Sequence, residues 1–462
     1  MSDPTKNQLS NKNLFGYALG AIPTGLMAFI FTFKYIEFFF DDLQLLPIYF
    51  IYGQIIYMVI NAINDPLLGQ LSDRTNRERW GSRRLIYIRY GGPIWALTFI
   101  LIWFPWSVSN QLIIFLHYTI SICLFDTFLT LVILVWMALL PEMTTNLNER
   151  NKANFISLML GLIAVGPFFM IIANLSTTSM EFKGLMVLIA IISLISLVLV
   201  SFFCKEREEF QKEESFPLWK SIKETVKLKS YRVFIAYNFC SVFLLNISLS
   251  YLFVYVLVLQ VSYNLALLGF LLIFIFIGYG SQFFCMKLME KENAWGMRRI
   301  ILTFGTLRVV GTLILFIVML IPGLEWCIWL AFIWSSIFGG YGVFTTGALM
   351  YLSVDEDELK HGIRREGMFL GINALFTKPA ASVGPIIATL ILVAFGYSQG
   401  SEIQTPTALL GIKVLFILVP VIVTAISMLI FYLYPLYGST LEELQTSLEI
   451  LHQKKREKLQ KP

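Results

Sequence analysis

Long uninterrupted apolar segments constrain the fold of this chain more than any other feature. Of its 462 residues, 57% are hydrophobic and only 14% are charged, and the apolar residues come in blocks of about twenty or more, long enough to cross a bilayer as helices. A soluble chain of this size needs far more polar surface. In lipid each backbone N–H and C=O group must be satisfied within its own segment, so these blocks predict helices rather than strands. The sequence therefore predicts an all-α membrane protein.

Twelve apolar blocks can be delimited, and we expect each to form one transmembrane helix. Their approximate bounds are residues 14–38, 46–69, 85–105, 110–140, 153–175, 182–203, 233–258, 264–287, 300–321, 326–352, 367–396 and 408–436. The first block lacks a small-residue cleavage signature, so we expect it to be retained rather than removed as a signal peptide.

The distribution of basic residues predicts the orientation in the membrane. Five arginines lie in the segment 70–84 and eight lysines or arginines in 204–232, whereas the alternate loops are almost bare of cations. By the positive-inside rule, the basic loops and both termini are cytoplasmic. The net charge of +5 therefore indicates anionic headgroups rather than nucleic acid as the partner.

The chain also repeats part of its sequence. The pentapeptide WGSRR at 80–84 returns as WGMRR at 295–299, 215 positions later, and Arg150 and Arg365 are related by the same offset. The shared offset predicts a duplicated six-helix unit, as in transporters that work by alternating access. We expect an N-terminal six-helix bundle (1–203), a cytoplasmic linker with an amphipathic helix (204–232), a C-terminal six-helix bundle (233–436) and a cytoplasmic C-terminal helix (437–462).

Several motifs resemble those of the glycoside–pentoside–hexuronide:cation symporter family, which contains the melibiose permease and belongs to the major facilitator superfamily. They are Ala62-Ile63-Asn64-Asp65-Pro66 with Gly69, Asp73-Arg74-Thr75, Arg79-Trp80-Gly81 with Arg83, Ala138-Leu139-Leu140-Pro141-Glu142, Glu149-Arg150, Arg365-Glu366-Gly367, Lys378 and Gly438-Ser439-Thr440-Leu441. The resemblance implies the major facilitator fold and the cation-coupled symport of a small organic solute. Relatives of the family include lysolipid symporters, so membership alone does not imply a sugar.

A carboxylate in a spanning helix is costly and marks a functional hypothesis. Asp65 lies on the cytoplasmic half of the second block, next to Asn64 and one turn after Asn61, and this cluster offers the carboxylate and amide oxygens that a hard cation needs. The resemblance implies a cation site on this helix, completed by a threonine of the fourth helix, which gapless counting from Pro141 places at Thr130. The alternative is that Asp65 only tethers the following loop. The coupling ion is sodium or a proton. The proton is an alternative because burial favours the neutral, protonated form of a carboxylic acid.

Four positions depart from the melibiose-type pattern. The sugar-binding acids of helices 1 and 4 and the arginine of helix 5 correspond to Gly25, Ile133 and Leu158, which cannot perform those roles. A second helix-2 aspartate is replaced by Asn61. The galactoside site is therefore not carried over, and the substrate stays open.

Other intramembrane polar residues predict a substrate cavity. Lys378, flanked by Thr377 and Pro379, lies near the middle of the eleventh block, where a lysine must meet an acid, a substrate oxygen or water. The resemblance places it between the cation site and the substrate. Asp126 lies in the middle of the fourth block and is a candidate ligand of substrate or cation; the alternative is an internal pair with a basic residue such as Arg308.

Charged residues of the predicted cytoplasmic loops are candidates for an inner gate. Pairs between the loops can close one conformation and separate in the other, although topology signalling alone also explains the arginines. The candidates are Asp73, Arg74, Glu142, Glu149, Arg150 and Arg365. At the opposite end of the first block, Lys34 and Glu37 are spaced to pair along the helix, and we expect both to reach the interface by snorkelling.

The sequence thus predicts a cation-coupled secondary symporter for a sugar, glycoside or other small organic solute. A lysolipid or amphiphile symporter is the first alternative; a membrane sensor or a membrane-integral enzyme is less favoured, since neither a catalytic motif nor an appended soluble domain is present in the sequence. We expect no cofactor and no metal beyond the coupling ion, because the five cysteines show no clustering. We further expect a monomer in the plasma membrane whose partners are a small-molecule substrate and the lipid bilayer.

Overall fold

The fold is known from a computed structural model. It describes residues 11–73, 75, 80–82, 84–143, 147–204, 225–251, 273, 276–278, 280–285, 287–288, 296–362, 366–401 and 403–460. Within these ranges every regular element is a helix and none is a strand. The predicted all-α class is confirmed.

The first spanning helix is continuous but contains two wider turns. It comprises α1 (Asn11–Ala18), α2 (Ala21–Pro23), the π-helical η2 (Thr24–Ala28), α3 (Phe29–Ile36) and the π-helical η3 (Glu37–Asp42). The rest of the N-terminal half consists of α4 (Pro47–Asp73), α6 (Leu85–Trp103), α7 (Gln111–Met143), α8 (Leu147–Asn174) and α9 (Met180–Phe203).

The C-terminal half follows the same plan over its described residues. Its helices are α11 (Lys229–Ser250), α14 (Met297–Val318), α15 (Cys327–Ile337), α16 (Tyr341–His361), α17 (Glu366–Ala394), α18 (Pro406–Lys413), the π-helical η5 (Val414–Leu418) and α19 (Val419–Tyr432). A final helix, α20 (Ser439–Gln460), lies within the predicted C-terminal segment.

Eleven of the twelve predicted spans coincide with described helices. Nine helices in the described ranges are long and apolar enough to cross a membrane; α4 and the pair α15–α16 occupy two more of the predicted blocks. More than half of the remaining block, 264–287, and most of the linker 204–232 lie outside the described residues. The domain boundaries therefore stay predictions.

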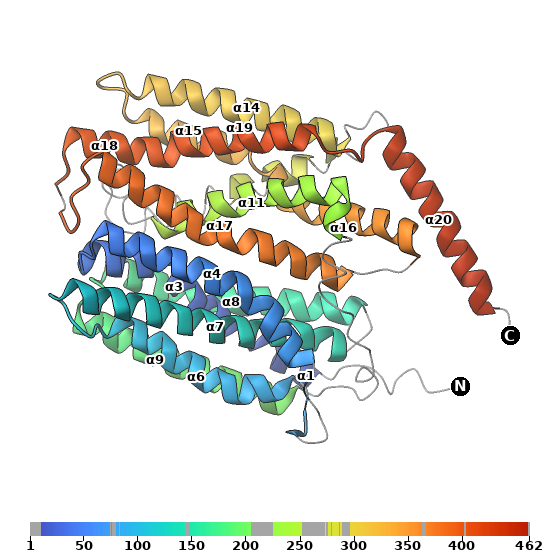
Figure 1. Ribbon diagram of the computed structural model, residues 1–462, viewed down its shortest axis with the longest axis horizontal. Helices are drawn as coiled ribbons and strands as arrows, with labels where there is room; N and C mark the ends of the chain where they lie inside the picture. The colour runs from blue at the N-terminus through green and yellow to red at the C-terminus, as the bar shows by residue number, and fades with distance from the viewer. Residues whose placement is uncertain are drawn as a thin grey trace.

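The helices form two stacked groups with their axes roughly aligned (Figure 1). The N-terminal group, α1 to α9, packs against the C-terminal group, α11 to α19, mainly through α4 and α17 and through α3 and α11. Both ends of the chain emerge at one end of the bundle, where α20 stands at an angle to the other helices (Figure 1). We call this the terminal end and the opposite one the distal end.

Lys34 corrects one sequence prediction. Its ammonium donates to both carboxylate oxygens of Glu37, at 2.7 and 2.8 Å, so the predicted pairing is confirmed. The predicted snorkelling is wrong, because the Lys34 side chain is completely buried. A carboxylate one turn away stabilises the buried ammonium, which therefore does not need to reach water.

Candidate cation and substrate site

A polar stripe follows one face of α4, which is otherwise apolar. Its members recur at helical spacing: Gln54, Tyr57, Asn61 and Asn64. The stripe faces α7, since the Gln54 amide donates to the hydroxyl of Tyr118 at 2.5 Å and the Asn64 amide donates to that of Thr127 at 3.0 Å. These bonds fix the rotation of α4 against α7.

A buried carboxylate of α7, that of Asp126, lies against the middle of the stripe. The Tyr57 hydroxyl donates to Asp126 Oδ1 at 3.0 Å, and Asn61 Nδ2 donates to the Tyr57 oxygen at 3.3 Å. All three side chains are buried. Arg308, the alternative partner of Asp126 predicted from the sequence, donates through Nε to Ser335 Oγ at 2.8 Å.

Asn61 keeps one unused acceptor. Its side chain is 3% exposed, and Oδ1 has no hydrogen-bond partner among the described residues. A buried amide oxygen without a donor is costly, and a bound cation or water would remove that cost. The Asn61 oxygen is therefore a ready ligand for a small cation.

Lys378 joins the two halves of the protein near the middle of the bundle. Its Nζ, on α17, donates to Thr130 Oγ1, on α7, at 3.1 Å. Thr130 is buried. The structure thus brings together the predicted threonine of the cation site and the predicted lysine of the substrate cavity, which lie 248 positions apart in sequence.

Thr377, the third predicted cavity residue, donates its hydroxyl hydrogen to the backbone of its own helix. Its Oγ1 donates to the backbone oxygen of Asn373 at 2.8 Å, so toward a substrate it can act only as an acceptor. The Asn373 side chain accepts from Asn238 on α11 at 2.9 Å. This contact orients α17 and hence the lysine one turn further along.

Asp65 belongs to α4, but its side chain lies outside the described residues. Its backbone position follows Asn64 directly and Asn61 by one turn, at the terminal end of the polar stripe. Whether the carboxylate completes a cation site therefore stays a prediction.

Most of the predicted gate residues also lie outside the described side chains. This holds for Asp73, Arg74, Glu142, Arg150 and Arg365, whereas Glu149 is described in the first turn of α8 and is half-buried. Nearby, the buried Arg84 donates to Ser72 Oγ at 2.8 Å, which ties the end of α4 to the start of α6. The gate assignment stays a prediction.

The distal end contains a second connection between the halves, which sequence reasoning missed. Asp41, at the end of the first spanning helix, accepts from the Tyr397 hydroxyl at 2.8 Å and from the Gly400 backbone N–H at 3.0 Å. The Gln399 amide donates to the backbone oxygens of Phe40 and Leu45, at 2.7 and 3.0 Å. We call these four hydrogen bonds the distal tie.

The Tyr397 phenol is held as a donor in the distal tie. Burial and the neighbouring Asp41 carboxylate raise the pKa of Tyr397 above its usual value. The hydroxyl therefore stays protonated where an ordinary tyrosine begins to ionise. The acidic pair at 41–42, directly after an apolar block, is the sequence signal that could have drawn attention to this end.

The positions that depart from the melibiose-type pattern have packing reasons. A Cβ at Gly25 would lie 2.9 Å from the backbone oxygen of Gly161, so the first spanning helix and α8 approach too closely for any side chain there. Ile133 packs against the hydrophobic core, and Leu158 is 58% exposed. None of these positions supplies a polar group to the site.

Comparison with known proteins identifies the family. The model of the MFS/sugar transport protein family matches residues 16–438. The chain belongs to this family. It is accordingly a multi-pass membrane protein and a transporter of the major facilitator superfamily, of the kind that includes glycoside/cation symporters.

Family relatives cover nearly the whole chain at low identity. Transmembrane protein 180 of Gallus gallus is 22% identical, with 92% of each chain covered. The putative glycoside/cation symporter YagG of Escherichia coli is 24% identical over 96% of this chain and 95% of its own. The sodium-dependent lysophosphatidylcholine symporter 1 of Xenopus tropicalis is 23% identical over 98% and 92%.

A solved structure shares the fold. A bacterial homologue of the human lysosomal transporter Spinster, in an inward-facing and unoccupied conformation, superposes with a TM-score of 0.61 over 92% of this chain and 95% of its own, at 12% identity. This agreement confirms the predicted major facilitator fold.

Proposed function

We propose that this protein is a cation-coupled symporter that moves a small organic solute across the cell membrane by alternating access. The observation that carries the proposal is the Lys378–Thr130 hydrogen bond. It joins the two halves next to the polar stripe of α4. In that stripe Asn61 Oδ1, which accepts no hydrogen bond from the described residues, is available to a cation. A half-buried lysine within a spanning helix at such a boundary is functional by default.

The coupling ion, sodium or a proton, binds on the terminal side of this bridge in our proposal. Asp65 supplies the charge, and Asn61, Asn64 and Thr130 supply neutral oxygens. Sodium favours several oxygen ligands at once, which the free Oδ1 of Asn61 supports. A single carboxylate in an apolar helix can alternatively take up a proton, since burial favours its neutral form.

Lys378 couples ion and solute in this proposal through repulsion between like charges. Its ammonium donates a hydrogen bond to the hydroxyl of Thr130, which we propose as a ligand of the cation. A cation that arrives there displaces the ammonium, which then turns to Thr377, Asp126 or a substrate oxygen. Electrostatic repulsion at close range in a low-dielectric site is strong enough to prevent the ammonium and the cation from contacting Thr130 at the same time.

The distal tie supports alternating access. It joins the halves at one end of the bundle, beyond the central bridge, with hydrogen bonds that a rocking motion can break and reform. We assign the distal end to the cell exterior and both termini to the cytoplasm, on the basis of the positive loops. The charged pairs predicted for the terminal end would then close the opposite state.

A sugar or glycoside is the solute class that we favour, since the family and the relative YagG carry sugar and glycoside in their names. Hydroxyl-rich solutes suit the amide, hydroxyl and ammonium groups of the stripe.

A lysolipid is the second candidate, and one structural observation favours it. A cavity of about 760 Å³ lies between α11, α17 and α19 and is lined almost entirely by apolar side chains, among them Phe239, Phe376 and Ile426. Phe376 and Ile426 are exposed. An acyl chain fits such a surface, and one relative is a lysophosphatidylcholine symporter.

Gradient-driven transport separates these possibilities. The purified protein in liposomes is given an inward sodium gradient, an inward proton gradient or neither, with a panel of pentosides, hexosides and lysophosphatidylcholine. We expect one gradient to drive accumulation of one solute class, and Asp65→Asn to abolish it. Equal uptake with and without every gradient would contradict coupling.

A further inference from the structure

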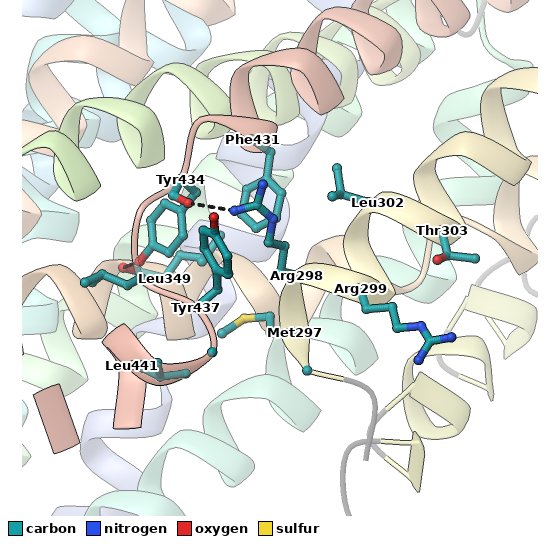
Figure 2. Close-up of a pocket in the computed structure, with 13 residues that line it drawn as sticks. Met297, Arg298, Arg299, Leu302, Thr303, Leu349, Phe431, Tyr434, Tyr437 and Leu441 are labelled. Carbon is teal, nitrogen blue, oxygen red and sulfur yellow. Dashed lines mark hydrogen bonds between the residues drawn. The ribbon is translucent and has the colours of Figure 1, made fainter. Parts of the chain in front are cut away.

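A cavity at the terminal end of the C-terminal half is separate from the proposed transport path. It has a volume of about 500 Å³ and lies where α14 begins, α19 ends and the chain turns into α20. Figure 2 shows Arg298, Tyr434 and Tyr437 grouped on one side of it, with Leu302 and Thr303 further along α14. The neighbouring residues Leu349, Leu436 and Leu441 add apolar surface.

The polar end of the cavity is positively charged. Arg298 and Arg299 flank the first turn of α14, whose N-cap residue Gly296 supplies no side-chain acceptor to the first N–H groups. A helix N-terminus carries partial positive charge. None of the thirteen residues that line the cavity, all of them in the described part of the chain, is acidic.

Arg298 is held in place by the surrounding structure. Its guanidinium donates to the backbone oxygens of Tyr432 and Tyr434, at 2.8 and 3.2 Å. It also lies 3.7 Å from the ring centre of Tyr437 (Figure 2). A fixed guanidinium is pre-organised for an anion, because binding does not have to order the side chain first.

We propose that this cavity binds an anionic phospholipid of the surrounding bilayer, with the phosphate at the first turn of α14 and the acyl region against the leucines and Phe431. Two features select a lipid over a soluble anion. The cavity lies at the ends of two spanning helices, at the depth of the headgroups, and most of its lining is apolar. Basic pockets in this position are known to hold anionic headgroups.

The bound lipid would stabilise the attachment of α20. Tyr434 and Tyr437 lie between the end of α19 and the start of α20, and the Tyr434 hydroxyl donates to the Leu349 backbone oxygen on α16 at 3.3 Å. A phospholipid in the cavity would contact α14, this connecting segment and Leu441 of α20 together. The site is therefore structural or regulatory rather than part of the transport path.

Retention of lipid by the purified protein tests this proposal. The full chain is prepared in nanodiscs of phosphatidylglycerol and phosphatidylcholine in equal amounts, and co-purifying lipids are measured by native mass spectrometry. The variants are Arg299→Gln and Leu302→Trp, which fills the cavity without changing charge; Arg298 is left intact because it also holds the end of α19. Arg89→Gln, an exposed arginine on α6 that lines neither cavity, is the matched control.

We expect wild type and Arg89→Gln to retain phosphatidylglycerol preferentially. Arg299→Gln should lower that retention about fivefold, the effect of one cation near an anionic headgroup, and Leu302→Trp should lower it by occupying the space of the acyl region. Equal retention of the two lipids by wild type, or an equal loss in Arg89→Gln, would overturn the proposal. Displacement of phosphatidylglycerol by millimolar inorganic phosphate would overturn the assignment to a lipid and indicate a soluble phosphate ligand instead.

Discussion

Two sets of hydrogen bonds between the halves of the protein differ in kind. The distal tie consists of four hydrogen bonds, three of which use the rigid backbone of the opposite half. The central bridge joins two side chains, Lys378 and Thr130. Several hydrogen bonds to the backbone favour one state of a gate, whereas a long flexible ammonium easily exchanges the Thr130 hydroxyl for a ligand. The difference indicates a gate at the distal end and a binding site at the centre.

Among the described side chains, the largest effect is expected from removing the charge of Lys378. Lys378→Met should lower gradient-driven transport about 10- to 100-fold, because a charge-assisted hydrogen bond contributes about 1.5–3 kcal/mol. Uptake in liposomes measures it, with thermal unfolding in detergent to verify the fold. Lys360→Met, which removes an exposed lysine paired with Glu356, is the matched control and should transport normally. Normal transport by Lys378→Met would show that the Lys378–Thr130 bridge is not needed for transport.

A somewhat smaller effect is expected at Asp126. Asp126→Asn retains an acceptor for Tyr57 but loses the negative charge, and we expect transport to fall about tenfold. Tyr57→Phe should show a similar loss, and the double variant should lose little more, since the two residues act through one hydrogen bond. Full additivity of the two losses would show that Asp126 acts independently of Tyr57.

Weakening the distal tie should change conformation rather than binding. Tyr397→Phe removes one hydrogen bond to a carboxylate, and we expect the population with an open distal end to rise about tenfold. Spin labels at Ser109 and Thr407, exposed positions on opposite halves, report the change by pulsed electron resonance. Tyr52→Phe, at an exposed tyrosine on α4, is the control. An unchanged distance distribution in Tyr397→Phe would contradict the assignment of a gate.

The pH dependence of the tie follows from the same tyrosine. Burial and Asp41 raise the Tyr397 pKa, so the neutral phenol, the form that donates, persists as the pH rises toward the usual tyrosine value of about 10. The stabilisation is fully present below the usual tyrosine pKa and is lost as the pH rises from there through the raised pKa. We expect the spin-label distances of wild type to stay constant up to about pH 10; opening with a midpoint near that pH would show that Tyr397 titrates normally.

The smallest effect is expected at Thr130. Thr130→Val removes the acceptor of the bridge but leaves the lysine, which can turn to another oxygen, so transport should fall about fivefold at most. Thr130→Ser keeps the hydroxyl and should restore wild-type uptake. A loss in Thr130→Val as large as that in Lys378→Met would show that the threonine has a further role.

Much of the fold could be predicted from the sequence because lipid imposes strong local rules. Each apolar block had to become a helix, and the block bounds alone placed α6, α7 and α9 closely. Asn61 and Asn64 could be selected as site candidates since polar groups are expensive in such helices, whereas Thr130 could be selected only through the resemblance to the symporter family. Tyr57 escaped selection, although its spacing from Gln54 and Asn61 marks the same face of α4.

Contacts across the boundary could not be predicted in this way. Lys378 and Thr130 lie on different halves, and their distance depends on how those halves rock against each other. The Asp41–Tyr397 contact depends on the π-helical end of the first spanning helix and on the loop after α17, neither of which hydropathy encodes. Lys34 was assigned to the interface because the block ends nearby, but its burial depends on Glu37 and on the packing around the first helix.

Cation binding without substrate is the most direct test of cation coupling through Asp65. Binding of sodium, lithium and protons to the reconstituted wild type is compared with binding to Asp65→Asn. We expect saturable binding of sodium, or of protons alone, that is lost in the variant, and the ion that binds identifies the coupling ion. Binding by Asp65→Asn that equals the wild type for every ion would make Asp65 structural and contradict the proposed coupling.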